Sequence, residues 1–137
     1  MAKGIYVNLP VKDLKKSMAF FSKLGFKFNP TFTDKNAACM VIGKNIYSML
    51  LVEKFFKGFT KRKILNAHKS TEVLIAIEVS SRKAVSDMVS KVVKAGGKTY
   101  RKADDHGWMY SHIFCDLDGH QWEPFYMDMK KMPKGSQ

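Results

Sequence analysis

The sequence predicts an α+β fold in which two βαβββ modules form curled mixed sheets around a cavity. Three observations indicate this fold. An apolar strand, an amphipathic helix and three short strands follow one another over residues 5–53, and the same order recurs over residues 72–127. Both predicted helices end at glycine, and both modules end in a predicted hairpin. Two long repeats fit a pair of modules in one domain, because a solenoid needs more and shorter units.

Length and composition indicate a single globular domain over residues 1–128 and a tail at 129–137 that is expected to fray. The chain has 137 residues, of which 45% are hydrophobic, and this suits one packed core. The longest apolar runs are too short to span a bilayer, and the first residues carry no secretion signal. We therefore expect a cytoplasmic protein with no membrane partner, in which Cys39 and Cys115 are buried thiols.

The first module is predicted from alternating strands and one amphipathic helix. Asp13 is a good N-cap residue, and Gly25 supplies the left-handed conformation that often ends a helix. Pro10 is expected to end the first strand. The expected elements are a strand at Ile5–Leu9, a helix at Leu14–Leu24, a strand from Phe26, and a hairpin of Ala37–Ile42 with Ile46–Val52.

A basic connector over residues 54–71 joins the modules. The net charge of the chain is +12, and its one concentrated basic group lies in this connector. The same segment carries several phenylalanines and has room for a short helix, and apolar residues in a loop often serve as a lid or a dimer contact. No known nucleic-acid-binding motif accompanies the charges, so nucleic acid is not the expected partner. The residues are Lys54, Phe55, Phe56, Lys57, Phe59, Lys61, Arg62, Lys63 and Lys69.

The second module repeats the order of the first. Its helix is expected to be capped by Ser80 or Ser81, and its last hairpin turns at Asp116–Gly119. The expected elements are a strand at Glu72–Val79, a helix at Arg82–Ala95, a short strand at Lys98–Tyr100, and a hairpin of Trp108–Cys115 with Gln121–Tyr126.

Several motifs carry a resemblance to a known family. In their order and spacing, over residues 4 to about 128, they resemble the vicinal oxygen chelate superfamily of glyoxalases, extradiol dioxygenases, fosfomycin-resistance thiol transferases and bleomycin-binding proteins. The resemblance implies the paired-module fold, a homodimer and, in metal-dependent members, ligands on the first and last strands of each module. The motifs are Asn8–Leu14, Phe20–Phe21 with Leu24–Phe26, Ala95–Gly97 and Asp116–Glu123, and Gly107–Tyr110 is similar to a bacterial glyoxalase-like branch.

Counting from these motifs places the four metal positions of the family at Tyr6, Met49, Leu74 and Glu123. Only Glu123 is a normal ligand for a divalent cation, because Leu74 has no donor atom and the Met49 thioether is soft. A slip of one or two residues brings in Asn8, Glu72 or Glu78, without placing three good donors on one face. We therefore expect an incomplete metal site and no firmly bound cofactor, with a divalent metal left open as an alternative.

Glu123 and His112 are the candidate catalytic residues. If the turn of the last hairpin places them on one face, they could be cross-strand neighbours and act as an acid–base or ligand couple. Otherwise His112 is a hydrogen-bonded strand histidine. Aromatic, amide and sulfur side chains on a concave surface suit a flat or apolar ligand, and the candidate ligand-binding residues are Tyr6, Asn8, Met49, Trp108, Tyr110 and Phe125.

These observations predict a glyoxalase-like protein that binds a small organic molecule, and they leave open whether it is an enzyme such as a lyase. One alternative is a metal-dependent lyase, isomerase or dioxygenase in which Glu123, His112 and water hold a metal that polarises a carbonyl. A second alternative is a binder of nucleic acid or an acidic protein through residues 54–69, whose affinity would fall steeply with salt.

Overall fold

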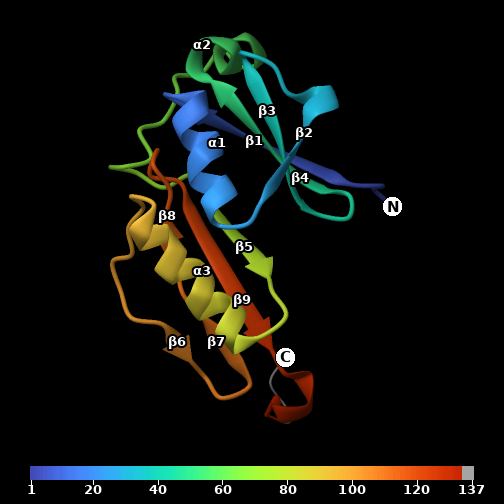
Figure 1. The fold of residues 1–137 in the computed structure, drawn as a ribbon, viewed down its shortest axis with the longest axis vertical. Coiled ribbons are helices and arrows are strands. Elements are labelled where there is room, and N and C mark those ends of the chain that lie inside the picture. Colours follow the sequence, from blue (N-terminus) through green and yellow to red (C-terminus); the bar gives the residue numbers. More distant parts are fainter. Residues whose placement is uncertain (134–137) are drawn as a thin grey trace. The chain divides into compact units, whose positions relative to one another are not determined.

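The computed structural model describes residues 1–133, and the chain divides into two compact units. Unit 1 begins at Met1 and ends at Asn66, and unit 2 begins at Ala67. In each unit a strand and a helix are followed by further strands, and one long helix packs on a mixed sheet (Figure 1). The predicted α+β class and the internal repeat are confirmed. The boundary at residue 66 falls inside the predicted connector, and the assignment of both modules to one domain stays a prediction.

Unit 1 contains a four-stranded sheet in the order β1-β4-β3-β2, with β1 parallel to β4 and the other pairs antiparallel. The prediction that Pro10 ends the first strand is wrong, because the strand continues to Val11. Since β1 pairs only with β4, it is an edge strand, where a missing N–H is tolerated. The elements are β1 (Ile5–Val11), α1 (Leu14–Lys23), β2 (Lys27–Asn29), β3 (Ala37–Gly43), β4 (Ile46–Val52), α2 (Glu53–Phe56) and 3-10 turns at Pro30–Phe32 and Lys57–Phe59.

The core of unit 1 lies between α1 and one face of its sheet. The side chain of Asp13 accepts a hydrogen bond from the Lys16 N–H at 3.0 Å, which confirms the predicted N-cap. Apolar residues at helical spacing on α1 meet alternate residues of the central strands. The buried side chains include Phe20 and Phe21 of α1, Leu9 and Val11 of β1, Met40 of β3 and Leu50 of β4.

Unit 2 contains a second mixed sheet in the order β5-β9-β7-β6, with β8 also paired to β9. The fully buried Trp122 and Phe114 lie on the side of α3, whose valines form its buried stripe. Ser81 caps this helix by accepting the Ala84 N–H at 3.0 Å. The elements are β5 (Leu74–Glu78), α3 (Arg82–Lys94), β6 (Asp104–Asp105), β7 (Met109–Ser111), β8 (Phe114–Cys115) and β9 (Gln121–Met127).

Two strand predictions in unit 2 are corrected. The strand expected over residues 108–115 is split into β7 and β8, because His112 donates its N–H to the Pro124 carbonyl at 3.3 Å and Pro124 has no N–H to complete the pair. The strand expected at Lys98–Tyr100 is reduced to a bridge between Lys98 and Cys115. The short strand β6 was not predicted, since aspartates are depleted in strands.

The connector and the tail each begin with short helical structure. The connector begins with α2 and a 3-10 turn, so the short helix that the sequence allowed is present. The tail begins with a 3-10 turn at Met129–Lys131, capped by Asp128. Residues 134–137 of the tail lie outside the described residues. No helix in the described part of the chain has the length and apolar character needed to cross a bilayer.

Candidate functional site

The face of the unit 1 sheet that α1 does not cover carries several of the predicted ligand-binding residues. Paired residues on neighbouring strands share a face, and this face alternates with the buried core residues Leu9, Met40 and Leu50. We call it the open face of unit 1. Its central residues are Tyr6 and Asn8 of β1, Tyr47 and Met49 of β4, and Cys39 and Val41 of β3.

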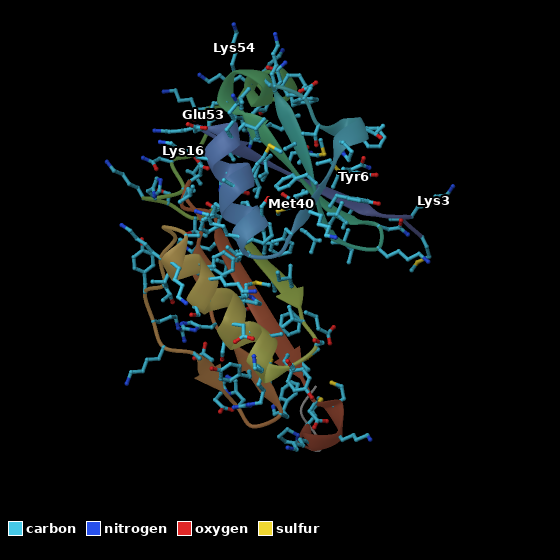
Figure 2. All side chains as sticks on the ribbon, viewed as in Figure 1. Lys3, Tyr6, Lys16, Met40, Glu53 and Lys54 are labelled. Carbon is cyan, nitrogen blue, oxygen red and sulfur yellow. The ribbon has the colours of Figure 1, made fainter. Side chains whose placement is uncertain are left out.

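The open face carries a pair of stacked tyrosines at one edge of the sheet. Tyr6 and Tyr47 are direct partners on β1 and β4, and their ring centroids lie 4.7 Å apart at an interplanar angle of 16°. Tyr6, which is labelled in Figure 2, is exposed to solvent over 56% of its surface according to its accessible area. Tyr47 was missed in the sequence, although its alternation with Met49 along the predicted hairpin strand was a usable signal. The pair offers aromatic surface to solvent.

The open face becomes more apolar and more buried along the strands. Asn8 is exposed and lies opposite Met49, which is half-buried. Met49 in turn pairs with the fully buried Cys39. Leu51, further along β4, is also buried. An amide and two phenols therefore stand beside the half-buried thioether of Met49, which suits a small organic ligand with both aromatic and polar parts.

Unit 2 has an equivalent sheet face on the side away from α3, which we call the open face of unit 2. Glu123 of β9 lies opposite Ala76 of β5 and on the same face as Phe125. Phe125 pairs with Ser111 of β7, which is buried. Leu74, the counterpart of Tyr6 in the repeat, is 57% exposed on the same face. Glu123 is half-buried and is the one carboxylate among the four family metal positions.

The strand register separates His112 from Glu123. The pairs Ser111–Phe125 and Phe114–Trp122 share one register, which places Ile113 opposite Glu123. The His112 ring nitrogen Nε2 instead lies 3.0 Å from the Thr99 hydroxyl and 2.8 Å from the Arg101 carbonyl oxygen. His112 is therefore the hydrogen-bonded strand histidine, and the structure does not bring the predicted catalytic couple together.

Tyr110 also lies on the side of the sheet away from Glu123. It pairs with Tyr126, its hydroxyl lies 3.3 Å from the Ser86 hydroxyl of α3, and the Arg82 guanidinium carbon sits 4.4 Å above its ring. Trp108 directly precedes β7, and its carbonyl accepts the Asp128 N–H at 2.7 Å. The sequence could not separate the two faces here, because it did not give the register of the hairpin.

An ion pair fixes the outer end of α3 to β6. The guanidinium of Arg82 hydrogen-bonds both carboxylate oxygens of Asp105, and the Gly107 N–H donates to the same carboxylate at 2.9 Å. These donors hold the pKa of Asp105 below its ordinary value. A carboxyl group with a lowered folded-state pKa contributes stability above its unfolded pKa, and this contribution is lost as the pH falls through the folded value.

Replacing Arg82 by Gln is therefore expected to raise the pKa of Asp105 toward the ordinary value of an aspartate. The reason is that the change removes the main donor to the carboxylate. The measurement is a carbon-detected NMR titration of the Asp105 carboxyl group. Lys83→Gln is the matched control, since Lys83 is on the same helix but pairs with Asp87 at 2.6 Å. An equal response to both changes would show that net charge, and not the ion pair, lowers the pKa.

The basic connector is exposed in unit 1. Figure 2 shows Lys54 pointing outward from α2, and Phe59, in the following 3-10 turn, is 70% exposed. Phe55 and Phe59 pack edge to face with centroids 5.3 Å apart. The other exposed basic side chains of this segment are Lys57, Lys61, Arg62 and Lys63.

The residues at the family metal positions do not fit a divalent metal. Tyr6, Met49, Leu74 and Glu123 offer a phenol, a thioether, no donor and one carboxylate, whereas a tight site needs three or more converging nitrogen, thiolate or carboxylate ligands. Over residues 1–133, no group of three or more His, Cys, Asp or Glu side chains could hold a metal ion. Burial raises the pKa of the Cys39 and Cys115 thiols, which disfavours the thiolate that binds metals.

The chain is similar to several known proteins. Residues 3–43 match the family model described as bleomycin resistance protein-like N-terminal. A hypothetical protein from S. aureus is 33% identical, with a TM-score of 0.76 over 92% of this chain and 95% of that one. Among curated proteins, no sequence matches the chain.

Two further solved structures share the fold at lower identity. A glyoxalase-related enzyme from Fulvimarina pelagi is 19% identical, with a TM-score of 0.76 over 92% of this chain and 88% of that one. A genomically encoded fosfomycin resistance protein from Listeria monocytogenes is also 19% identical, with a TM-score of 0.67 over 95% of this chain and 98% of that one. Together with the repeat, the sheet order and the family-model match, these similarities show that the chain belongs to the vicinal oxygen chelate superfamily, which includes the glyoxalases, bleomycin resistance proteins and dioxygenases.

Proposed function

We propose that this protein binds a small organic molecule without the aid of a metal ion. The fold family supports a glyoxalase-type small-molecule-binding protein, and the donor set at the family metal positions favours the metal-independent form. On this proposal, Tyr6, Asn8, Tyr47 and Met49 bind the ligand on the open face of unit 1. Glu123 and Phe125 are the corresponding residues on the open face of unit 2.

The observation that carries this proposal is the stacked pair Tyr6–Tyr47, in which Tyr6 is exposed and Tyr47 is half-buried. A flat ligand laid against such rings gains both apolar burial and ring stacking. Asn8 stands two residues from Tyr6 on the same face and is exposed. Its side-chain amide both donates and accepts hydrogen bonds, so it suits a polar group at the edge of an aromatic ligand.

Glu123 has a supporting role in this proposal. A half-buried carboxylate without two further metal ligands is a hydrogen-bond acceptor and a modest base. Its neighbours Ala76 and Phe125 make its surroundings largely apolar, which strengthens a hydrogen bond to a ligand. The metal-dependent alternative loses its second ligand, because the register separates His112 from Glu123. Binding of nucleic acid or an acidic protein by residues 54–69 stays a prediction.

Tyr6→Ala is expected to weaken ligand binding about tenfold or more, because the change removes half of the stacked pair. The measurement is a thermal-shift screen of aromatic small molecules against the full chain, followed by calorimetric titration of the best hits. Tyr100→Ala is the matched control, since Tyr100 is 74% exposed and lies outside both open faces. Equal affinities of wild type and Tyr6→Ala for every hit would contradict the proposed site.

Metal content is measured on the same preparations. Near-stoichiometric metal that disappears in Glu123→Gln would contradict metal-independent binding and favour the lyase or isomerase alternative. The proposal expects Glu123→Gln to change the affinity for the ligand and to leave the metal content unchanged.

A further inference from the structure

A single row of residues crosses the whole sheet of unit 1 on its open face. Tyr6 of β1 pairs with Tyr47 of β4, Tyr47 pairs with Val41 of β3, and Val41 pairs with Lys27 of β2. Paired residues point to the same side of a sheet. The row therefore begins with two stacked aromatic rings, continues with a small apolar side chain and ends with a cation.

The spacing of this row matches a small aromatic molecule. Neighbouring strands are about 4.8 Å apart, so the backbone of Lys27 lies roughly 10 Å from that of Tyr47. The lysine stem is apolar and can lie along Val41 while the ammonium group stays in water. Lys27 is exposed and Val41 is half-buried, so the ammonium can approach the outer edge of a ligand that lies on the tyrosine pair.

The charge of the protein is concentrated in the same unit. Residues 1–66 contain 13 Lys and Arg against three Asp and Glu, a formal charge of +10 out of the total of +12. None of the three acidic residues lies on the open face: Asp13 caps α1, Asp34 caps a turn, and Glu53 is in α2. A field of one sign raises the local concentration of ligands of the opposite sign.

We propose that the open face of unit 1 selects flat aromatic molecules that carry an anionic group, with the ring on Tyr6 and Tyr47 and the anion at Lys27. This inference rests on the proposed function and adds the class of ligand. Asn8, in the next row, supplies a neutral donor on the same side of the ring. An aromatic cation has no carboxylate partner on this face and meets the positive field of the unit.

The test compares two probes of the same shape, 2-naphthoate and the neutral 2-naphthamide, by calorimetric titration of the full chain. Naphthoate is expected to bind about fivefold more tightly, a preference typical of one charge-assisted contact at an exposed site. Lys27→Gln is expected to abolish this preference and to leave naphthamide binding unchanged. Added salt should reduce the preference in the same way.

Lys15→Gln is the matched control, since it removes the same charge from the exposed side of α1 in the same unit. Retention of the naphthoate preference in Lys15→Gln and its loss in Lys27→Gln would support the proposal. Equal binding of the two probes, binding of neither, or equal losses in both variants would overturn it. If the two probes bind equally and Tyr6→Ala still weakens the binding of both, the proposed function stands and only the ligand class is wrong. If Tyr6→Ala has no effect on any binding, the proposed function is wrong as well.

Discussion

Gly119→Ala is expected to lower the free energy of unfolding by about 3 kcal/mol, from backbone strain and from a steric clash together. Gly119 has a φ of +86°, a conformation that side-chain-bearing residues rarely adopt. A Cβ atom built there would lie 2.7 Å from the Ala67 carbonyl carbon and 2.7 Å from the His68 nitrogen. Both contacts are backbone atoms, so the segment itself would have to move. The measurement is urea unfolding of the full-length variant.

Gly25→Ala is the matched control for this prediction. Gly25 has a φ of +101°, but a Cβ atom there would meet nothing within 4 Å. The free energy of unfolding of this variant is therefore expected to fall by only about 1 kcal/mol, the cost of the left-handed conformation for a residue with a Cβ atom. Equal losses of unfolding free energy in the two variants would show that the clash of the added Cβ atom with residues 67 and 68 contributes nothing to the effect of Gly119→Ala.

This close approach is relevant to the candidate site because it lies at the turn that precedes β9. Gly119 closes the turn by donating its N–H to the Asp116 carbonyl at 3.1 Å. Strand β9 begins two residues later and carries Glu123. The start of unit 2 thus lies against the turn from which β9 and Glu123 follow.

Local signals in the sequence were sufficient for most of the fold. Asp13 marked the start of α1, and the pair Ser80–Ser81, of which Ser81 is the cap, marked the start of α3, because a short polar side chain before an apolar stripe caps an N-terminus. The repeat gave the order of elements in both units. Pro10 was misread because edge or central position depends on which strands pair, and strand pairing is not encoded locally.

The candidate site was less predictable for the same reason. The alternation of Tyr6 and Asn8 along one strand placed them correctly on one face. The relation of Glu123 to His112 and Tyr110 depends on the register between β7 and β9, and a one-residue change of register exchanges the faces. Lys27 was not singled out, because its place in the row with Tyr6 emerges only from three successive strand pairings.

The second large effect is expected at Asp116, the buried carboxyl group of the last turn. Its oxygen Oδ1 accepts the Asp118 and His120 N–H groups at 2.9 and 3.0 Å, and Oδ2 accepts the Trp122 indole N–H at 3.0 Å. Burial raises the pKa of this carboxyl group, while the nearby His120 and the hydrogen bonds oppose that shift. All three of these groups donate a hydrogen bond to the carboxylate, so its two oxygens act as acceptors that hold the turn to the core.

Asp116→Asn is expected to lower the free energy of unfolding by about 2 kcal/mol. The amide oxygen can keep the two backbone N–H donors, but the amide NH2 group then faces the indole N–H, which is also a donor. Trp122 is fully buried, so no solvent replaces the lost acceptor. The measurement is urea unfolding at neutral pH, with Asp118→Asn as the control, because the Asp118 side chain lies one residue from the same turn glycine and is only half-buried.

A double-mutant cycle with Trp122→Phe isolates the indole contact. Trp122→Phe removes the donor and leaves a smaller ring in the core, so it destabilises the protein by itself. In the Trp122→Phe background, Asp116→Asn no longer places an amide NH2 group against an indole N–H. The loss of unfolding free energy caused by Asp116→Asn is therefore expected to be about 1 kcal/mol smaller than in the wild type. Strictly additive effects would show that the indole bond is not what makes the carboxylate necessary. A coupling of the expected size would assign Asp116 to the stability of the turn that carries β9, and would keep it separate from the ligand-binding chemistry of Glu123.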